Sequence, residues 1–218
     1  MSGRATVLSR IRRALADVPP DERPEDTPVL RDYGRTPPAT EPAGLARLLA
    51  TNLADYRARV HRSAPAELPG LIGELLRARE ASRVVVPPGV PAGWLPPGTA
   101  RWVREPDELS LRQLDAVDAV VTGCAVAVAD TGTLVLDGGP GQGRRRDTLV
   151  PDHHICVVRV PEQLVASVAE ALPRLDPRRP LTWISGPSAT SDIELDRVEG
   201  VHGPRLLEVV LVERDDTG

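Results

Sequence analysis

The chain has 218 residues, of which 41% are apolar, enough to bury the core of one α/β domain with extra segments at its N-terminal end. Its 27 basic and 31 acidic residues give a net charge of −4, and aromatic residues make up 2%, which argues against a nucleic-acid partner because phosphate binding needs a positive face and base stacking needs aromatic rings. No apolar run approaches the roughly 18 residues of a membrane span and no hydrophobic signal segment follows Met1, so we expect a soluble, cytoplasmic protein with no membrane span.

The N-terminal segment predicts an amphipathic helix over residues 3–16. Its apolar positions recur at helical spacing and are Val7, Leu8, Ile11, Ala14 and Leu15. Its polar side is rich in arginine: Arg4, Arg10, Arg12 and Arg13. This pattern favours a helix that docks on the body or on a partner, with a transit peptide as the alternative. Residues 17–42 are rich in Pro, Asp and Glu and predict a linker, so the domain boundaries are 1–16 (helix), 17–42 (linker) and 43–214 (main domain).

Strand and helix patterns alternate through the main domain. Helical spacing predicts helices near residues 45–56, 68–76, 109–114 and 161–175. Short apolar runs predict strands at 84–86, 101–103, 119–121, 155–160, 181–184 and 206–212. Residues 125–129 and 133–136 flank the turn formers Asp130-Thr131-Gly132 and predict a hairpin, which makes the sheet mixed. The expected fold is a three-layer α/β/α sandwich with a mixed sheet.

The segment that follows the predicted strand at 181–184 has the composition of a binding loop. A Gly-Pro-Ser loop ends the strand and is expected to start a brief helix at Ser191, whose free backbone N–H groups suit a carboxylate or phosphate. Ser191 and Glu194 also fit a capping box, which gives Glu194 and Asp192 a purely structural interpretation. However, Glu199 and His202 lie close by in the sequence, and a histidine among carboxylates is how a general base or a metal ligand is assembled.

Two other glycine-containing segments have competing interpretations. Residues 138–147 (GGPGQGRRRD) either wrap an anion with glycine amides and an arginine fork or form a mobile loop with solvated arginines; they lack the ending of a nucleotide P-loop and open no clear helix. Residues 130–133 (DTGT) alone favour a hairpin turn, in which Asp and Gly serve the backbone.

The cysteines and histidines give no metal motif. Cys124 and Cys156 lie in apolar runs and are expected to be small core residues, so we predict no zinc site and no iron–sulfur cluster on this chain. His153 and His154 begin a strand, where neighbours alternate between faces, so one is expected to be buried or to face a site while the other is exposed. A metal site that combines Asp152, His153 or His154 with His202 has no supporting spacing.

Four separated segments together resemble the LUD domain family. They are 129–136 (ADTGTLVL), 149–155 (LVPDHHI), 185–194 (SGPSATSDIE) and 200–204 (GVHGP). The resemblance covers roughly residues 45–213 and implies a fold similar to the sugar isomerase and CoA-transferase group. It also implies a role in oxidising L-lactate to pyruvate beside an iron–sulfur subunit and a cysteine-rich subunit from the same operon. Fused members of the family carry cysteine clusters that are absent here, so any redox cofactor, whose identity is unknown, is expected to be soluble or to belong to a partner.

These observations predict a pocket for a small carboxylate or an anionic cofactor. The residues expected to bind the anion are Gly186, Pro187, Ser188, Thr190 and Gly203, with Thr131, Gly132 and Thr133 facing it from the hairpin and Arg144 or Arg145 closing over it. The residues expected to orient the ligand or move protons are Asp130, Asp192, Glu194 and His202. Two alternatives stay open: a non-catalytic assembly subunit that docks through its N-terminal helix, and an enzyme related to CoA transferases or to the folate cyclo-ligase that uses Glu194 or Glu199 as nucleophile or base.

Overall fold

A computed structural model describes residues 3–19, 23, 41–104, 109–190, 198–199 and 203–213, without the side chains of 189–190 and 198–199. The chain divides into two units, Met1–Gly34 and Arg35–Gly218. The first contains helix α1 (Gly3–Ala14), on which Val7 and Ile11 are exposed. The linker predicted over 17–42 falls mostly outside the described residues. None of the helices in the described ranges has the length and apolar character needed to cross a membrane.

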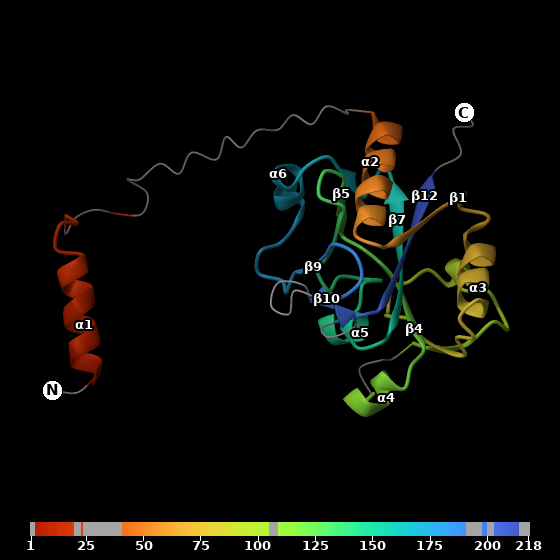
Figure 1. Ribbon diagram of the computed structural model, residues 1–218, viewed down its shortest axis with the longest axis horizontal. Coiled ribbons are helices and arrows are strands. Elements are labelled where there is room, and N and C mark those ends of the chain that lie inside the picture. Colours follow the sequence, from red (N-terminus) through yellow and green to blue (C-terminus); the bar gives the residue numbers. More distant parts are fainter. Residues whose placement is uncertain are drawn as a thin grey trace. The chain divides into compact units, whose positions relative to one another are not determined.

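The second unit is built on a six-stranded sheet, called the large sheet below (Figure 1). Its strands in spatial order are β1 (Arg59–Ser63), β12 (Leu206–Glu213), β7 (His153–Val160), β4 (Ala119–Gly123), β2 (Arg83–Val85) and β3 (Arg101–Val103). All of its pairings are parallel. Strands β7 and β12 are each eight residues long and pair along their whole length, from Leu206 opposite His153 to Glu213 opposite Val160.

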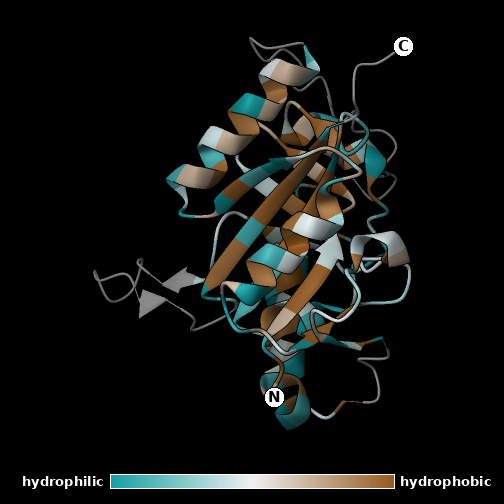
Figure 2. Cartoon of the chain, turned by 90° about the vertical axis from the view of Figure 1, so that its right-hand side faces the viewer, coloured by the Kyte–Doolittle hydropathy of each residue, from teal (hydrophilic) through white to brown (hydrophobic). Residues whose placement is uncertain are grey.

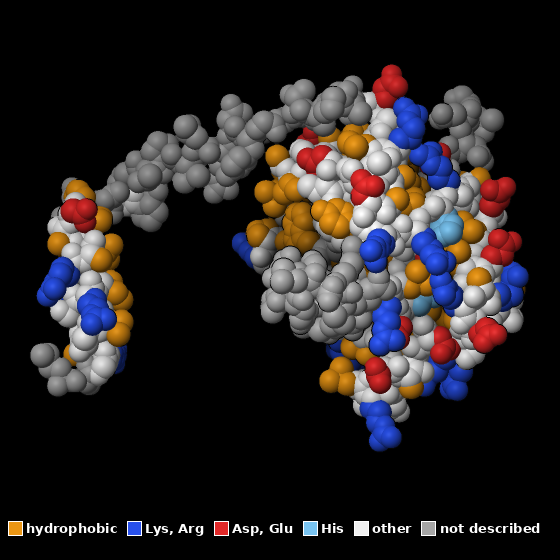
Figure 3. Space-filling model, in the orientation of Figure 1, with side chains coloured by type: hydrophobic (Ala, Val, Ile, Leu, Met, Phe, Trp, Pro, Cys, Tyr) orange, Lys and Arg blue, Asp and Glu red, His pale blue; other side chains and the backbone are white. Residues whose placement is uncertain are grey.

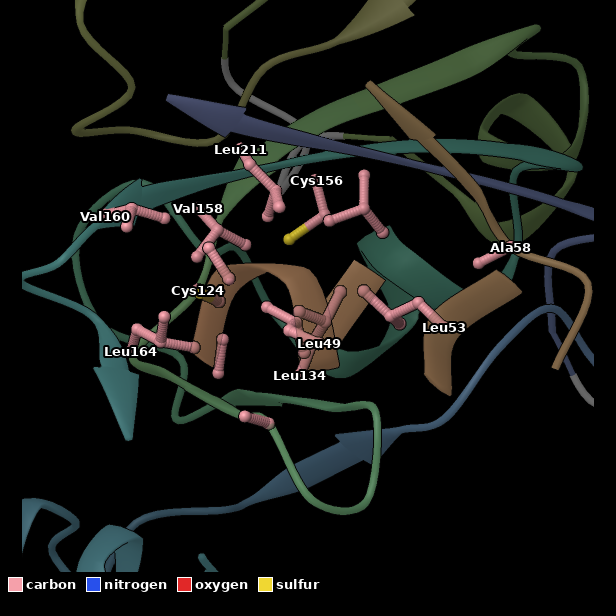
Figure 4. Close-up of a cluster of buried hydrophobic side chains, with 14 of the residues drawn as sticks. Leu49, Leu53, Ala58, Cys124, Leu134, Cys156, Val158, Val160, Leu164 and Leu211 are labelled. Atoms are coloured by element: carbon pink, nitrogen blue, oxygen red, sulfur yellow. The ribbon is translucent and has the colours of Figure 1, made fainter. Parts of the chain in front are cut away.

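Helices cover both faces of the large sheet, which is why its central strands are apolar along their length (Figure 2). Helix α3 (Leu68–Arg77) packs on the face that carries Ile155 and Val157. Helix α2 (Pro42–Asp55) packs on the opposite face. There its Leu49 and Leu53 point toward Cys156, Val158 and Leu211 of the sheet (Figure 4).

A second, four-stranded sheet lies beside α2 and is called the small sheet below. Its strands in spatial order are β8 (Leu164–Val165), β5 (Val126–Val128), β6 (Thr133–Leu136) and β9 (Thr182–Ile184). Its pairings are parallel for β5 with β8 and antiparallel for the other two, and helix α6 (Val168–Ala171) packs on its outer face. The predicted α/β fold class is confirmed, and the predicted hairpin is β5–β6. The mixed pairing lies in the small sheet, whereas the large sheet is parallel throughout.

The prediction of a helix over residues 161–175 is wrong for the first half of that range. There Leu164 and Val165 form β8, followed by α6 and by a 3₁₀ turn at Leu172–Arg174. Both β8 residues are buried and pair with β5, and the side chain of Gln163 donates to the carbonyl of Cys124 and accepts the N–H of Arg159. Tertiary pairing of a buried apolar dipeptide therefore overrides its helical spacing.

The remaining elements are short. They are helix α4 (Leu111–Asp115), the 3₁₀ turn Ala92–Trp94, helix α5 (Arg145–Leu149) and the antiparallel strands β10 (Ala189–Thr190) and β11 (Val198–Glu199). Helix α4 confirms the prediction at 109–114, and Ser110 caps it by accepting the N–H of Gln113. The helix predicted to begin at Ser191 lies outside the described residues, and its flanks pair as β10 and β11.

The hairpin turn between β5 and β6 is fixed against α2. The Asn52 side chain donates to the carbonyls of Ala129 at 2.8 Å and Asp130 at 3.0 Å. Gly132 has a φ of +58°, and a Cβ there would lie 2.8 Å from the carbonyl carbon of Asn52. Glycine is needed here because it adopts a positive φ without strain and has no Cβ to clash with α2. This close approach brings the small sheet onto α2.

We predict that Gly132→Ala lowers the free energy of unfolding by roughly 1–3 kcal/mol, because it adds left-handed strain and a contact with α2. The matched control is Gly70→Ala on the exposed side of α3, where an added Cβ meets nothing within 4 Å. That change should raise the free energy of unfolding by up to about 1 kcal/mol. Urea denaturation of both variants measures the two effects, and a Gly132→Ala variant as stable as wild type would show that the turn is not held against α2.

Candidate functional site

A cavity of about 300 Å³, called the first cavity below, lies where the end of β9 meets α5 and the starts of β7 and β12. Its polar side chains are Arg145, His154, Thr182, Ser185 and Ser188. The rest of its lining is Leu149, Trp183, Ile184, Gly186, Pro187, Gly203, Pro204 and Leu207. The cavity thus draws together segments that are far apart in the sequence.

Arg145 supplies the single charge among the described residues that line the first cavity. It is the first residue of α5, which the sequence did not predict; the helix begins there because the buried carboxylate of Asp147 accepts the N–H of Arg144 at 2.9 Å. No ionic partner of the Arg145 guanidinium lies in the described part of the chain. Counting the described residues alone, the cavity carries one positive charge without an ionic partner, which suits a monoanion.

A chain of hydroxyl groups runs from the hairpin to the first cavity. Thr131 Oγ1 and Thr133 Oγ1 lie 2.8 Å apart, and Thr133 Oγ1 lies 2.8 Å from Ser185 Oγ. Thr133 is buried, so it reaches the cavity through Ser185 and does not line it. The Ser185 hydroxyl is therefore held in one orientation, and its remaining hydrogen bond points in a defined direction.

Ser188 and Gly186 shape the loop that follows β9. The N–H of Ser188 donates to the carbonyl of Pro204 at 2.8 Å, so Ser188, which was predicted to bind an anion, can offer it only the side-chain hydroxyl. Gly186 has a φ of +85°, and a Cβ there would lie 2.5 Å from the carbonyl oxygen of Tyr56 at the end of α2. The loop is therefore held on one side by α2 and on the other by the segment that precedes β12.

His154 lines the first cavity from within the large sheet. It is fully buried, and its Nε2 lies 2.7 Å from Thr122 Oγ1. Its Nδ1 has no hydrogen-bond partner among the described residues. Burial, with a smaller effect from His153, lowers the pKa of His154 to about 3. The imidazole is therefore neutral at pH 7 and suits a hydrogen bond to a ligand better than proton transfer.

The structure brings some of the predicted site residues together and separates others. Those that line the first cavity are Arg145, Gly186, Pro187, Ser188 and Gly203. Thr131 and Thr133 do not line the first cavity but reach it through hydrogen bonds that end at Ser185. Gly132 faces α2. Arg144 lines two neighbouring cavities. Asp130 is exposed in the hairpin turn, and the partial desolvation of its carboxyl, with a smaller effect of the Glu170 charge, raises its pKa. The described residues do not include three of the predicted site residues, Asp192, Glu194 and His202. They also lack the side chains of Thr190 and Glu199.

The expectation that one of the two adjacent histidines is exposed is wrong, because β7 is covered on both faces. His153 and His154 are 5% and 0% exposed. His153 points to the α3 side, where its Nε2 lies 3.3 Å from the carboxylate of Glu208. Burial alone would raise the pKa of Glu208, but the hydrogen bond to His153 and the fields of His153, His61 and Arg59 outweigh it and lower that pKa. Arg59, one of the cations that lower the pKa of Glu208, lies on the surface over β1 with Arg62, where arginine side chains lie beside a histidine (Figure 3).

The two cysteines are buried in the core between α2 and the sheets, as predicted (Figure 4). Contact with the thiol of Cys156, followed by burial, raises the pKa of Cys124, which makes it a poor nucleophile. No group of three or more His, Cys, Asp or Glu residues in the described ranges is arranged to hold a metal ion.

The comparisons with known proteins agree with this architecture. Residues 46–212 match the model of the LUD domain. The chain belongs to the LUD domain family. A lactate utilization protein C from Deinococcus radiodurans is 46% identical over 94% of this chain and 93% of its own length, and one from Shouchella clausii is 31% identical over 54% and 53%. The crystal structure of a DUF162 family protein from Deinococcus radiodurans superimposes with a TM-score of 0.67 at 40% identity, covering 80% of this chain and 99% of that one. Membership in the family confirms the resemblance inferred from the four motifs.

The depressed pKa of His154 predicts a pH-dependent stability. The unfolded chain binds a proton at His154 near pH 6.5 and the folded chain only near pH 3, so the free energy of unfolding falls as the pH drops through this window. Between about pH 7 and about pH 5 the expected loss from this residue is about 2 kcal/mol. His154→Gln should remove that share of the pH dependence, which urea denaturation at the two pH values measures. Equal pH dependence in wild type and variant would contradict a buried neutral His154.

Proposed function

We propose that this chain is a cytoplasmic subunit of a lactate utilization system and that its first cavity binds the carboxylate of L-lactate or pyruvate. The relatives named lactate utilization protein C support the biological role. The observation that carries the ligand assignment is Arg145, the one charged side chain among the described lining residues, with no ionic partner in that part of the chain. A monocarboxylate supplies the matching single negative charge.

The size and lining of the first cavity support a small acid. Its volume of about 300 Å³ lies at the lower end of the range for ligand sites. Leu149, Ile184 and Leu207 provide apolar surface for a methyl group. The hydroxyl of Ser185, fixed by Thr133, and the neutral imidazole of His154 provide uncharged hydrogen-bonding groups for the hydroxyl or keto oxygen of the ligand.

In this proposal the chain binds and orients lactate or pyruvate, and partner subunits take up the electrons when lactate is oxidised. Arg145 grips the carboxylate through two N–H groups, and Ser185 and His154 fix the oxygen at C2. Oxidation of lactate to pyruvate releases two electrons and two protons, and the family resemblance assigns the electrons to the iron–sulfur and cysteine-rich subunits of the same operon. The exposed apolar positions Val7 and Ile11 of α1 support a docking role for that helix within such an assembly.

We predict that the full chain binds pyruvate and L-lactate in a calorimetric titration and does not bind lactamide, which has the same shape without the charge. Arg145→Gln should weaken pyruvate binding roughly 10- to 100-fold, because it removes a charge-assisted hydrogen bond to the carboxylate.

The matched control is Arg178→Gln. Arg178 is exposed and is not among the lining residues of the first cavity, so its replacement should leave the affinity unchanged. Pyruvate binding that is equally strong in wild type and Arg145→Gln would rule out the first cavity as the carboxylate site.

A further inference from the structure

Helix α1 carries an apolar stripe that the described residues of its own unit leave uncovered. None of the residues of α1 is buried. The stripe consists of five apolar side chains of the helix and the turn that follows it, each between 37% and 56% exposed: Val7, Leu8, Ile11, Leu15 and Val18. Their three- and four-residue spacing places them on one face. Such a face is expected to bind a partner that removes it from water.

The charged residues of α1 are all basic and are arranged around the apolar stripe. At about 100° per residue, Arg10 and Arg12 lie on either side of Ile11, at the two edges of the stripe, and Arg13 lies opposite. Arg4 precedes the stripe. Apolar side chains gather along one side of this helix, with arginine side chains away from that side (Figure 3). Without any Asp or Glu, α1 has a net charge of +4.

A lipid surface with anionic headgroups matches both features of α1. A helix of this kind lies in the membrane interface, with its apolar face at the boundary of headgroups and acyl chains. Arginines at the edges of the stripe extend their guanidinium groups to the headgroup phosphates, and each adds to the attraction. In coiled-coil pairing with another protein, by contrast, charges of both signs beside the stripe set partner and register. Helix α1 offers one sign only.

We propose that α1 attaches the chain to an anionic membrane surface, with the apolar stripe in the interface and Arg10 and Arg12 on the headgroups. This inference goes beyond the proposed function, in which α1 docks within an assembly: its role there is to hold the assembly on the membrane. The net charge of −4 for the whole chain includes the +4 of α1, so the remainder carries −8. An anionic surface repels that remainder, so the attachment depends on α1.

The test is co-sedimentation of the full chain with two kinds of vesicle, phosphatidylcholine alone and a mixture of phosphatidylglycerol with phosphatidylcholine. We expect binding to the mixed, anionic vesicles only, and we expect added NaCl to weaken it because salt screens the attraction. Ile11→Asp should weaken this binding roughly tenfold or more, because it places a charge in the apolar stripe. Replacing Arg10 and Arg12 together by Gln should also weaken it roughly tenfold or more.

The matched control is Leu111→Asp, the same kind of change at an exposed apolar residue of α4. It should leave vesicle binding unchanged. Because Ile11 and Leu111 are both exposed, both variants should keep the stability of wild type, which urea denaturation checks.

Three outcomes would overturn the membrane attachment: equal binding to neutral and anionic vesicles, anionic vesicles bound as tightly by Ile11→Asp as by wild type, and no binding to anionic vesicles at all. The last would leave α1 as a helix that docks on protein. Pyruvate titration of the same samples tests the proposed function separately. Pyruvate binding without vesicle binding would leave the proposed function standing, and vesicle binding without pyruvate binding would contradict it while supporting the attachment.

Discussion

The parallel pairing of β7 with β12 is the constraint on which the candidate site depends. Because Leu207 lies opposite His154 in this register, both residues face the first cavity, while His153 and Glu208 are directed to the α3 side. A shift of one residue would exchange these two sets of side chains. The cavity lies at the starts of these strands, whereas open parallel sheets more often bind ligands at their carboxyl ends. The reason is that β9 of the small sheet ends there and supplies the hydroxyl-bearing loop.

Burial of polar groups inside this pairing is costly unless each group finds a partner. On the α3 side, Nε2 of His153 lies 3.3 Å from the carboxylate of Glu208, whose lowered pKa keeps it ionised, while Nδ1 of His153 has no hydrogen-bond partner among the described residues. On the cavity side, His154 is held neutral by burial and is bonded to Thr122 through one nitrogen only. A buried imidazole with one unpartnered nitrogen at the wall of a cavity is the kind of group that a bound ligand completes.

The strands with continuous apolar sequence, such as those of β7 and β12, could be predicted because burial on both faces leaves a simple signal. Strand β1 gave no such signal: it is an edge strand in which Val60 is flanked by Arg59, His61 and Arg62. The four motifs identified the family, and the sequence placed Arg145 over the loop at 185–188, together with which Arg145 lines the first cavity. His154 and Thr182 also line the first cavity, but the sequence did not predict them as site residues, because the pairing of β7 with β12 and of β9 with β6 is what places them there.

The most direct test of this account is a crystal structure of the full chain with pyruvate. The account predicts pyruvate in the first cavity, with its carboxylate on the guanidinium of Arg145 and its keto oxygen within hydrogen-bond distance of Ser185 or His154. Pyruvate bound elsewhere, or a first cavity filled by the chain's own side chains with Arg145 directed to solvent, would contradict it.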